Sequence, residues 1–223
     1  MKNTIPFRER VRRTLISSAQ IYQHIFVEYD YLILSADFRI RSYYIVSADQ
    51  DNFLHLTGVH TTLSASEFFC KCISGSLQQD DFDIPDKSTK GSVRRKISVL
   101  PSISEIFTTD CKIQESFHKN HIACSIATST ASFTIGFTNT IKIRPQTLLK
   151  GDEIKNEAYS SPQLILRKAR HENDVFTDIV TEKYDAIMEN YAILQNLLAM
   201  NIRKIIIRRI YIHEIIRFFT MHC

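Results

Sequence analysis

The segment Phe53–Val59 (FLHLTGV) constrains the fold most, because its residues alternate as they would in a half-buried strand. Successive side chains of a strand point to opposite faces of a sheet. Leu54 and Leu56 are therefore expected to face the core, while His55 and Thr57 lie side by side on the other face. The pattern predicts a strand that presents a histidine and a hydroxyl together.

The residues that follow this segment predict a capped helix. Gly58 permits a tight turn that a side chain with a Cβ would resist. Ser64 is followed three residues later by Glu67, which is the spacing of a capping box at a helix start. Gly75 is well placed to end that helix in a left-handed conformation. We therefore expect a strand, a turn and a helix in direct succession.

The composition indicates a basic cytoplasmic protein. The formal net charge is +4 with a pI near 8.8, which tilts weakly toward an anionic partner. Five cysteines and a polar, basic start (MKNTIPFRERVRR) favour reduced thiols and no secretory signal. The most apolar segment, Ile202–Phe219, contains six charged residues, so we expect no membrane span.

The first third of the chain predicts a helix followed by strands. A rough helical stripe runs from Pro6 to Tyr29, and its start is rich in arginine. Tyr31–Ala36 and Ser42–Ala48 are rich in aromatic and branched residues, as strands are. Together with Phe53–Val59 they are expected to form a three-stranded meander.

The middle of the chain predicts a loop, two helices and a second group of strands. Leu77–Gly91 is polar and is expected to be a long loop. A helix follows up to Leu100, is broken by Pro101, and resumes at Ser102. Strands are then expected at His121–Thr128 and Ser132–Thr138, which would form a hairpin, and at Gln163–Ala169, with TLLKGDE as a loop between them. This order predicts an α+β fold: a curved antiparallel sheet with helices packed on one side.

The C-terminal part has a helical pattern from about Asp174. Eight of ten positions that step by four and three from Ile187 to Phe219 are apolar, which is heptad-like. The helix would pack on its own domain, associate with a second copy, or lie on a membrane surface; the branched run Ile205–Ile207 would alternatively form a strand. We expect a domain at residues 1–180 and a helical extension at 181–223.

Two groups of residues have side chains suited to chemistry. Cys111, His118, His121 and Cys124 are metal-ligand types, but their spacing matches no common zinc site, so no metal or cofactor is expected. His55 is the stronger candidate. RNA cleavage without metal needs a base for the ribose 2′-hydroxyl, an acid for the leaving oxygen, and cations or hydroxyls at the phosphate. Histidine suits either proton role, and the candidates for the phosphate are Lys87, Lys90, Arg94, Arg95, Lys96, Thr128 and Thr134.

Several stretches of the chain together resemble a known family. They are YYIVSADQDNFLHLTGV, LSASEFFCKCISGSL, DDFD, VRRKISVLP, TLLKG and LILRKA, between about Ile21 and Ile179. The chain resembles the phage- and mobile-element-associated Barnase–EndoU–colicin–RelE-like (PBECR-type) nuclease domains. The resemblance implies helical material packed on a curved antiparallel sheet, and a metal-independent ribonuclease used in conflict between phage, plasmid and host. It implies a functional role for His55, which lies in the most characteristic stretch.

These observations predict a metal-independent endoribonuclease of toxin type. The expected catalytic residues are His55, Thr57 and Arg94, and the expected RNA-binding residues are Lys90, Arg95 and Thr134. The expected partners are tRNA or single-stranded RNA, an antitoxin or immunity protein, and a second copy bound through the C-terminal helix. The alternative is a non-catalytic RNA- or protein-binding module of mobile-element origin that self-associates through the same helix.

Overall fold

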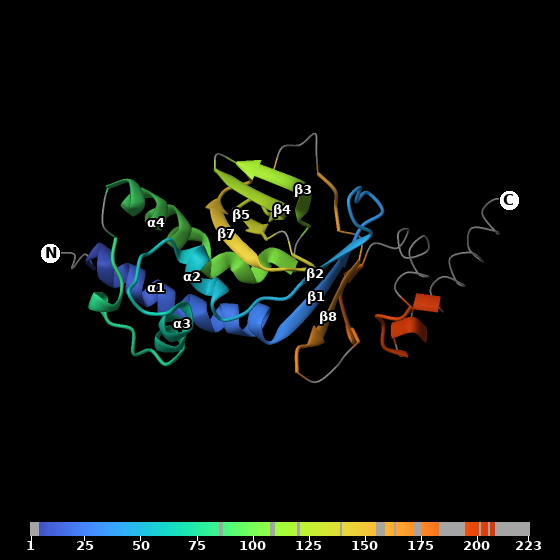
Figure 1. Cartoon of the computed structure of the whole chain (residues 1–223), viewed down its shortest axis with the longest axis horizontal. Coiled ribbons are helices and arrows are strands. Elements are labelled where there is room, and N and C mark those ends of the chain that lie inside the picture. The colour runs from blue at the N-terminus through green and yellow to red at the C-terminus, as the bar shows by residue number, and fades with distance from the viewer. Residues whose placement is uncertain are drawn as a thin grey trace, which may run out of the picture.

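A computed structural model shows an α+β fold with two sheets and several helices (Figure 1). It describes residues 5–84, 87–107, 110–119, 121–138, 140–154, 159–162, 164–171, 175–182, 195–200, 202–204 and 206–207. In chain order the elements are α1 Phe7–Tyr22, the π-helix η1 Gln23–Val27, β1 Tyr29–Leu34, β2 Tyr43–Val46, α2 Asn52–Thr57, α3 Ala65–Ile73, the 3-10 helix η2 Gln79–Asp81, α4 Lys87–Val99, the 3-10 helix η3 Leu100–Phe107, β3 Lys112–Lys119, β4 Ile122–Ser129, β5 Phe133–Phe137, β6 Lys142–Ile143, β7 Pro145–Lys150, β8 Leu164–Ala169 and β9 Asp178–Glu182.

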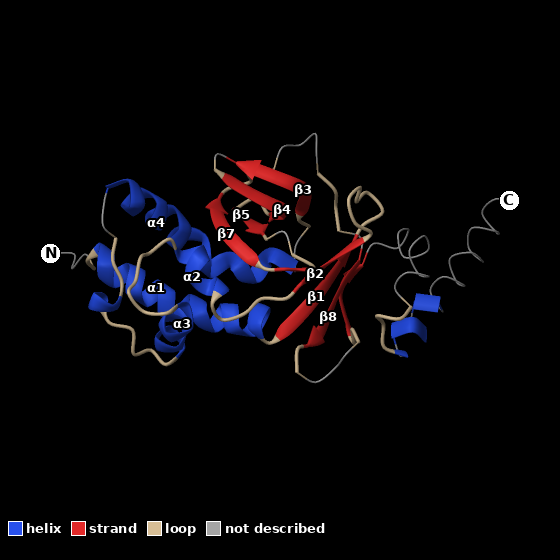
Figure 2. Cartoon of the chain, viewed as in Figure 1, coloured by secondary structure: helices blue, strands red, loops and turns tan. Residues whose placement is uncertain are grey.

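The helices α1 to α4 gather at one end of the molecule, β1, β2 and β8 lie toward the other end, and the second sheet lies between them (Figure 2). α1 buries Val11, Leu15, Ala19 and Tyr22, which recur at the helical period and so form one stripe. This stripe packs against α3 and η3. The Tyr22 ring lies 5.3 Å from that of Phe53 and is part of an aromatic cluster. The helical layer is therefore centred on the C-terminal end of α1.

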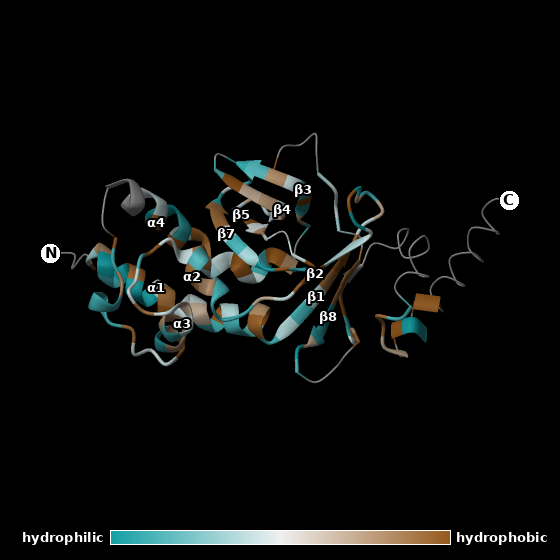
Figure 3. Cartoon of the chain, viewed as in Figure 1, coloured by the Kyte–Doolittle hydropathy of each residue, from teal (hydrophilic) through white to brown (hydrophobic). Residues whose placement is uncertain are grey.

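The first sheet has the strand order β6-β2-β1-β8-β9 and is antiparallel except for the pair β2–β6. β1 is buried along nearly its whole length because both of its faces are covered. Tyr31 and Ile33 face the main core. Leu32 and Leu34 face a second apolar cluster that includes tail residues, and Figure 3 shows hydrophobic stretches on the described tail. The other buried members of that cluster are Leu164, Leu166, Phe176, Leu198, Ile202 and Ile206.

The second sheet has the order β3-β4-β5-β7 and is antiparallel throughout. All five residues of β5 are buried. Gly136 of this strand faces Cys124 so closely that a Cβ would lie 2.5 Å from the Cys124 sulfur. α2 and α4 both pack against β7, at the outer edge of this sheet. The second sheet thus positions the two helices that carry the predicted site residues.

Arg170, directly after β8, joins the strands to the segment that leads into α2. Its guanidinium donates to the Ala48 carbonyl at 2.5 Å, to the Ser47 hydroxyl at 3.1 Å and to an Asp49 carboxylate oxygen at 2.8 Å. The Tyr22 hydroxyl donates to the Asp49 carbonyl from the helical layer at 3.0 Å. One arginine therefore connects the first sheet, the β2–α2 segment and α1.

The predicted first helix and the capped helix agree well with the structure. The predicted first helix is α1 followed by the π-helical turn η1. Ser64 accepts a hydrogen bond from the Glu67 amide at 3.2 Å, as a capping serine does. Gly75 follows the helix with a φ of 73°, as expected. The strands β1, β2, β4, β5 and β8 and the β4–β5 hairpin are also confirmed, with shifted ends.

The predicted strand Phe53–Val59 is wrong, because these residues form the helix α2 and its C-terminal turn. The buried residues are Phe53, Leu56 and Thr57, which are spaced as one face of a helix, while Leu54 is only half-buried. The meander is absent from this region, because β6 pairs with β2 from far along the chain. A strand and a helix would bury different residues of this segment. The helix forms because it buries Phe53, Leu56 and Thr57 against residues that are distant in the sequence.

Further expectations about the strands and loops are corrected. TLLKGDE is not all loop, because most of it forms β7, which pairs with β5. Residues 178–182 are the strand β9 beside β8 and not the start of a helix. The strand β3 was not predicted. The expected long loop ends early, because α4 begins at Lys87. The strands form two sheets and not the one curved sheet that was expected.

The predicted long C-terminal helix is not seen in the tail residues that the structure describes. Leu198 forms a parallel bridge with Phe176, and helical residues occur at 200, 202–204 and 206–207. The rest of the predicted helix and its association with a second copy lie outside the described residues. The domain boundary near residue 180 stays a prediction, while Leu198, Ile202 and Ile206 pack on the first sheet.

Replacing Arg170 by methionine is expected to destabilise the fold by about 3 kcal/mol, because it removes three hydrogen bonds and the cation 3.6 Å from the buried Asp30 carboxylate. Arg167→Met is the matched control on the same strand. It removes an exposed pair with Asp178 and is expected to cost less than about 1 kcal/mol. Urea unfolding of both variants measures the difference, and equal costs would contradict a special role for Arg170.

Candidate functional site

His55 is exposed on α2, a short helix whose two ends are both fixed by local contacts. At its start, the side-chain oxygen of Asn52 accepts a hydrogen bond from the Asp49 amide at 2.9 Å. At its end, Gly58 adopts a φ of 74° that favours glycine. Because Phe53 and Leu56 are buried against the core, the intervening His55 side chain faces solvent. The fold therefore presents this imidazole on a rigid support.

Lys96 of α4 reaches the same helix end. Its Nζ donates to the His55 carbonyl at 2.9 Å, and a cation at this position interacts favourably with the C-terminal carbonyls of α2. Its aliphatic stem covers Gly58, where an added Cβ would lie 3.0 Å from the Lys96 Cδ. Gly58 is therefore required twice, for its backbone conformation and for the close approach of this lysine.

Burial lowers the pKa of Lys96 from 10.5 to about 8, because the half-buried ammonium loses water that would stabilise its charge. An amine with this pKa is present in both protonation states near neutral pH. The charged form can bind a phosphate, and the neutral form can accept a proton. Lys96 and His55 thus place two proton-exchanging groups at one helix end.

The hydroxyls of Thr57 and Thr134 are buried and bonded within the fold. Thr57 donates to the Leu54 carbonyl at 2.8 Å, on the opposite face of α2 from His55. Thr134 contacts the Ser129 hydroxyl at 2.8 Å and the Gly151 carbonyl at 2.9 Å. Their roles at the site stay predictions, and these contacts give both hydroxyls a clear structural function.

The two arginines of α4 have different surroundings. The Arg94 guanidinium lies over the Phe7 ring, 5.4 Å from its centre, and so faces α1. Arg94 and Lys96 are two residues apart, which places them on nearly opposite sides of a helix. Arg95 is exposed, and the Lys90 side chain lies outside the described residues. Of the predicted cations, the structure brings Lys96 to His55.

Lys96 is among the candidate cations for the phosphate, but it is not among the expected catalytic or RNA-binding residues. A sequence signal for it exists. Val93, Ile97 and Leu100 are buried and form the apolar stripe of α4 and its continuation. Lys96 falls within that stripe, three residues after Val93 and four before Leu100. A lysine at such a position must extend along apolar surface to reach a polar partner.

The predicted metal-ligand types do not form a cluster among the residues that the structure describes. No group of three or more histidine, cysteine, aspartate or glutamate side chains there is arranged to bind a metal ion. His118 and Cys124 nevertheless line one pocket together. Burial raises the pKa of the Cys124 thiol to about 11, so this cysteine stays protonated at neutral pH.

The family model for the phage-Barnase-EndoU-ColicinE5/D-RelE like nuclease 4 domain (PBECR4) matches residues 14–195. The chain belongs to this family, in agreement with the resemblance of its sequence. No curated protein and no solved structure matches the chain significantly. Within the described part of the chain, none of the helices has the length and apolar character needed to cross a membrane.

Gly58→Ala is expected to destabilise the fold more than Gly75→Ala. Both glycines have nearly the same positive φ, so both changes cost roughly 1–2 kcal/mol of backbone strain. Only the Cβ at position 58 also meets Lys96, while position 75 is open. Thermal unfolding of both variants, repeated with Lys96→Ala, tests the contact. The excess cost should disappear without Lys96, and its persistence would contradict the contact.

Stability is expected to rise with pH between about 8 and 10.5 because of Lys96. Its pKa is lower in the folded chain, so the unfolded chain binds more protons in this range. The cost of burying the charge is therefore complete below pH 8 and disappears by pH 10.5. The buried Cys72 and Cys124 thiols, whose pKa values burial raises, act in the opposite direction, so the contribution of Lys96 is measured as a difference between variants. Urea unfolding at pH 7.5 and 9.5 should show this gain, relative to Lys96→Met, in the wild type and in Lys150→Met, an exposed lysine. Lys96→Met should lack it, and an equal gain in all three proteins would refute the assignment.

Proposed function

We propose that this chain is a metal-independent endoribonuclease whose reaction centre includes His55. The observation that carries the proposal is that a lysine of lowered pKa donates to the backbone carbonyl of the exposed His55 at one helix end, in a member of a nuclease family. Perturbed titratable groups on a rigid support are typical of catalytic sites. Neither group requires a metal for proton transfer.

The proposed reaction is an attack of the ribose 2′-hydroxyl on the adjacent phosphorus. His55 takes the hydroxyl proton or returns a proton to the leaving oxygen. A new bond forms between the 2′-oxygen and phosphorus while the bond from phosphorus to the 5′-oxygen breaks. The products are a 2′,3′-cyclic phosphate and a free 5′-hydroxyl. The Lys96 ammonium stabilises the charge that accumulates on the phosphate, and at higher pH its neutral amine is a second base.

The remaining cations of α4 extend the proposed site. We assign Arg94, Arg95 and Lys90 to contacts with phosphates of the bound strand beyond the cleaved bond. Arg95 is exposed on the helix that carries Lys96. Arginine suits phosphates because its planar group donates two parallel hydrogen bonds. A substrate of tRNA or single-stranded RNA, a toxin role in conflict with a host, and an antitoxin or immunity partner are part of the same proposal.

His55→Ala is expected to reduce RNA cleavage by at least about 100-fold, the usual contribution of a proton-transfer group. Total tRNA and a short single-stranded RNA are incubated in EDTA, and the products are analysed for 2′,3′-cyclic phosphate ends. His60→Ala is the matched control, because His60 is also exposed and its backbone alone forms the bridge to Asp83. This control should cleave at the wild-type rate.

Two outcomes would overturn parts of the proposal. Full cleavage by His55→Ala would show that the chain is a nuclease whose reaction centre does not include His55. An absence of cleavage by the wild type, with and without magnesium, would favour the alternative of a non-catalytic module. RNA binding retained by both proteins would then identify the chain as a binding domain.

A further inference from the structure

A pocket of about 250 Å³ lies between the β1–β2 loop and the β3–β4 hairpin, and so joins the two sheets. It is separate from the helix end that carries His55 and Lys96. Its polar lining comes from Arg41 and Tyr44 on one side and from Ser116, His118 and Ser125 on the other. A second hollow of about 370 Å³ is lined by residues of the loop itself and shares Ile40 and Arg41 with the pocket. The loop therefore has recessed surface on both sides of Ile40 and Arg41.

Glu115 of β3 fixes the shape of this loop. Its carboxylate accepts hydrogen bonds from the Arg39 amide at 2.7 Å, from the Ile40 amide at 3.2 Å and from the Tyr44 hydroxyl at 2.5 Å. Burial and this carboxylate raise the pKa of Tyr44, so its hydroxyl remains a donor. The negative charge of Glu115 is thus already satisfied by three donors, and the loop is rigidly tied to the second sheet.

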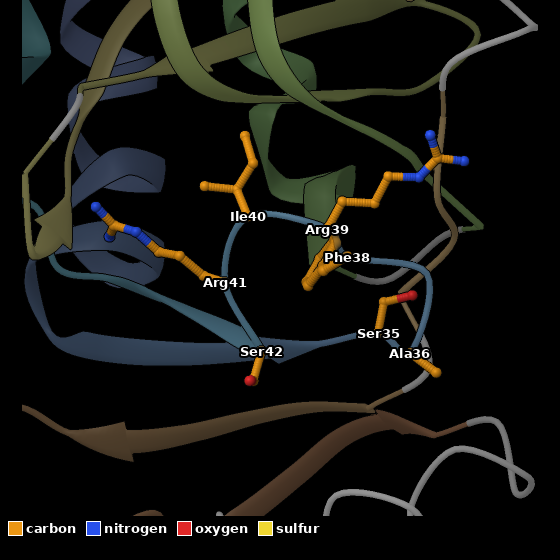
Figure 4. A pocket seen from close by; sticks show the side chains of 7 residues that line it. All are labelled: Ser35, Ala36, Phe38, Arg39, Ile40, Arg41 and Ser42. Atoms are coloured by element: carbon orange, nitrogen blue, oxygen red, sulfur yellow. The ribbon is translucent and has the colours of Figure 1, made fainter.

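The two arginines of the loop point to different sides. Figure 4 shows Arg39 and Arg41 extending in opposite directions, with Ile40 between them. The Arg41 guanidinium lies over the Tyr44 ring at 5.5 Å and donates to the Thr140 carbonyl at 3.1 Å. A guanidinium has five N–H donors, so these contacts orient the group and leave further donors for a ligand. Asp37, the carboxylate of the loop, is not part of the lining of either hollow.

A strained residue turns the opposite wall toward the pocket. Ser116 has a φ of 52°, the one positive value among the non-glycine residues that the structure describes. It lies between the pairs Glu115–Ile126 and Phe117–Cys124, and the register of β3 and β4 is the same on both sides of it. Its carbonyl lies 2.8 Å from Nδ1 of His118, which orients the imidazole. Such strain persists where the surrounding structure determines it, and it is concentrated at functional sites.

We propose that this pocket binds a phosphate ester, with Arg41 and His118 as the groups that contact the phosphate. Arginine donates to phosphate oxygens, and the His118 imidazolium donates through Nε2 because its Nδ1 is bonded to the Ser116 carbonyl. The Ser116 hydroxyl adds a further polar contact, while the Ser125 hydroxyl already donates to the Thr138 carbonyl. The Glu115 carboxylate is occupied by its three neutral donors. The volume is small for a ligand pocket and fits one nucleotide-sized group. Ile40, 60% exposed, offers an apolar surface next to the phosphate site. The inference is independent of the proposed reaction at His55.

The test measures binding to the full chain by NMR titration with uridine 3′-monophosphate, inorganic phosphate and uridine. The two phosphates are expected to bind and to shift the His118 resonances, while uridine is not. Arg41→Gln is expected to weaken uridine monophosphate binding by about tenfold or more. His118→Gln should weaken it as well. Arg167→Gln is the matched control, because Arg167 also lies over a tyrosine ring but is paired with Asp178, and it should bind like the wild type.

A 2′-O-methyl tetranucleotide without terminal phosphates distinguishes the source of the ligand, because it cannot be cleaved. Binding of this tetranucleotide would assign the pocket to the internal phosphates of a strand. If uridine monophosphate binds and the tetranucleotide does not, the pocket is assigned to free phosphate esters. An unchanged affinity of folded Arg41→Gln for uridine monophosphate would overturn the proposal. So would the failure of the wild type to bind either phosphate compound. Loss of RNA cleavage in His55→Ala would not alter either result.

Discussion

The hydrogen bonds of Arg170 are the interaction on which the arrangement of the site depends. They fix Ser47, Ala48 and Asp49 to the end of β8, directly before the helix that carries His55. Tyr22 contacts the same segment from α1, where burial raises the pKa of its hydroxyl and keeps it a donor. α2 has only six residues, too few to be stable by itself, so its position is determined by these neighbours and by packing on β7.

The sequence predicted the features that local interactions determine. The capped helix was predicted well because Ser64 and Gly75 act within one turn of the helix ends. The segment FLHLTGV was wrongly predicted as a strand, because its apolar residues fit both a strand and a short helix. Its helical structure depends on burial of Phe53 and Thr57 against distant residues. β7 and β9 were missed for a related reason. Each is a strand because it pairs with the edge of a nearby strand, β7 with β5 and β9 with β8.

The candidate site was predictable in its residue types more than in its arrangement. The chain has several cations after the capped helix. The face of α4 that is turned toward α2 determines which of them contacts His55. The apolar stripe through Val93 and Leu100 directs Lys96 toward α2, while Arg94 faces Phe7. The pocket beside Arg41 had no sequence signal at all. It arises from a contact between Glu115 and a loop that lies more than seventy residues away in the chain.

The two regions use their cations in physically different ways. Lys96 extends along apolar surface and is half-buried, which lowers its pKa and makes it suited to proton exchange. The Arg41 guanidinium is oriented by an aromatic ring and by the Thr140 carbonyl, which suits it to binding without chemistry. α2 packs on β7 and the pocket adjoins β3, so the two regions lie at opposite edges of a four-stranded sheet. Three strand spacings amount to about 14 Å, a distance that a short single strand spans. The second sheet therefore separates the proposed reaction centre from the proposed phosphate site.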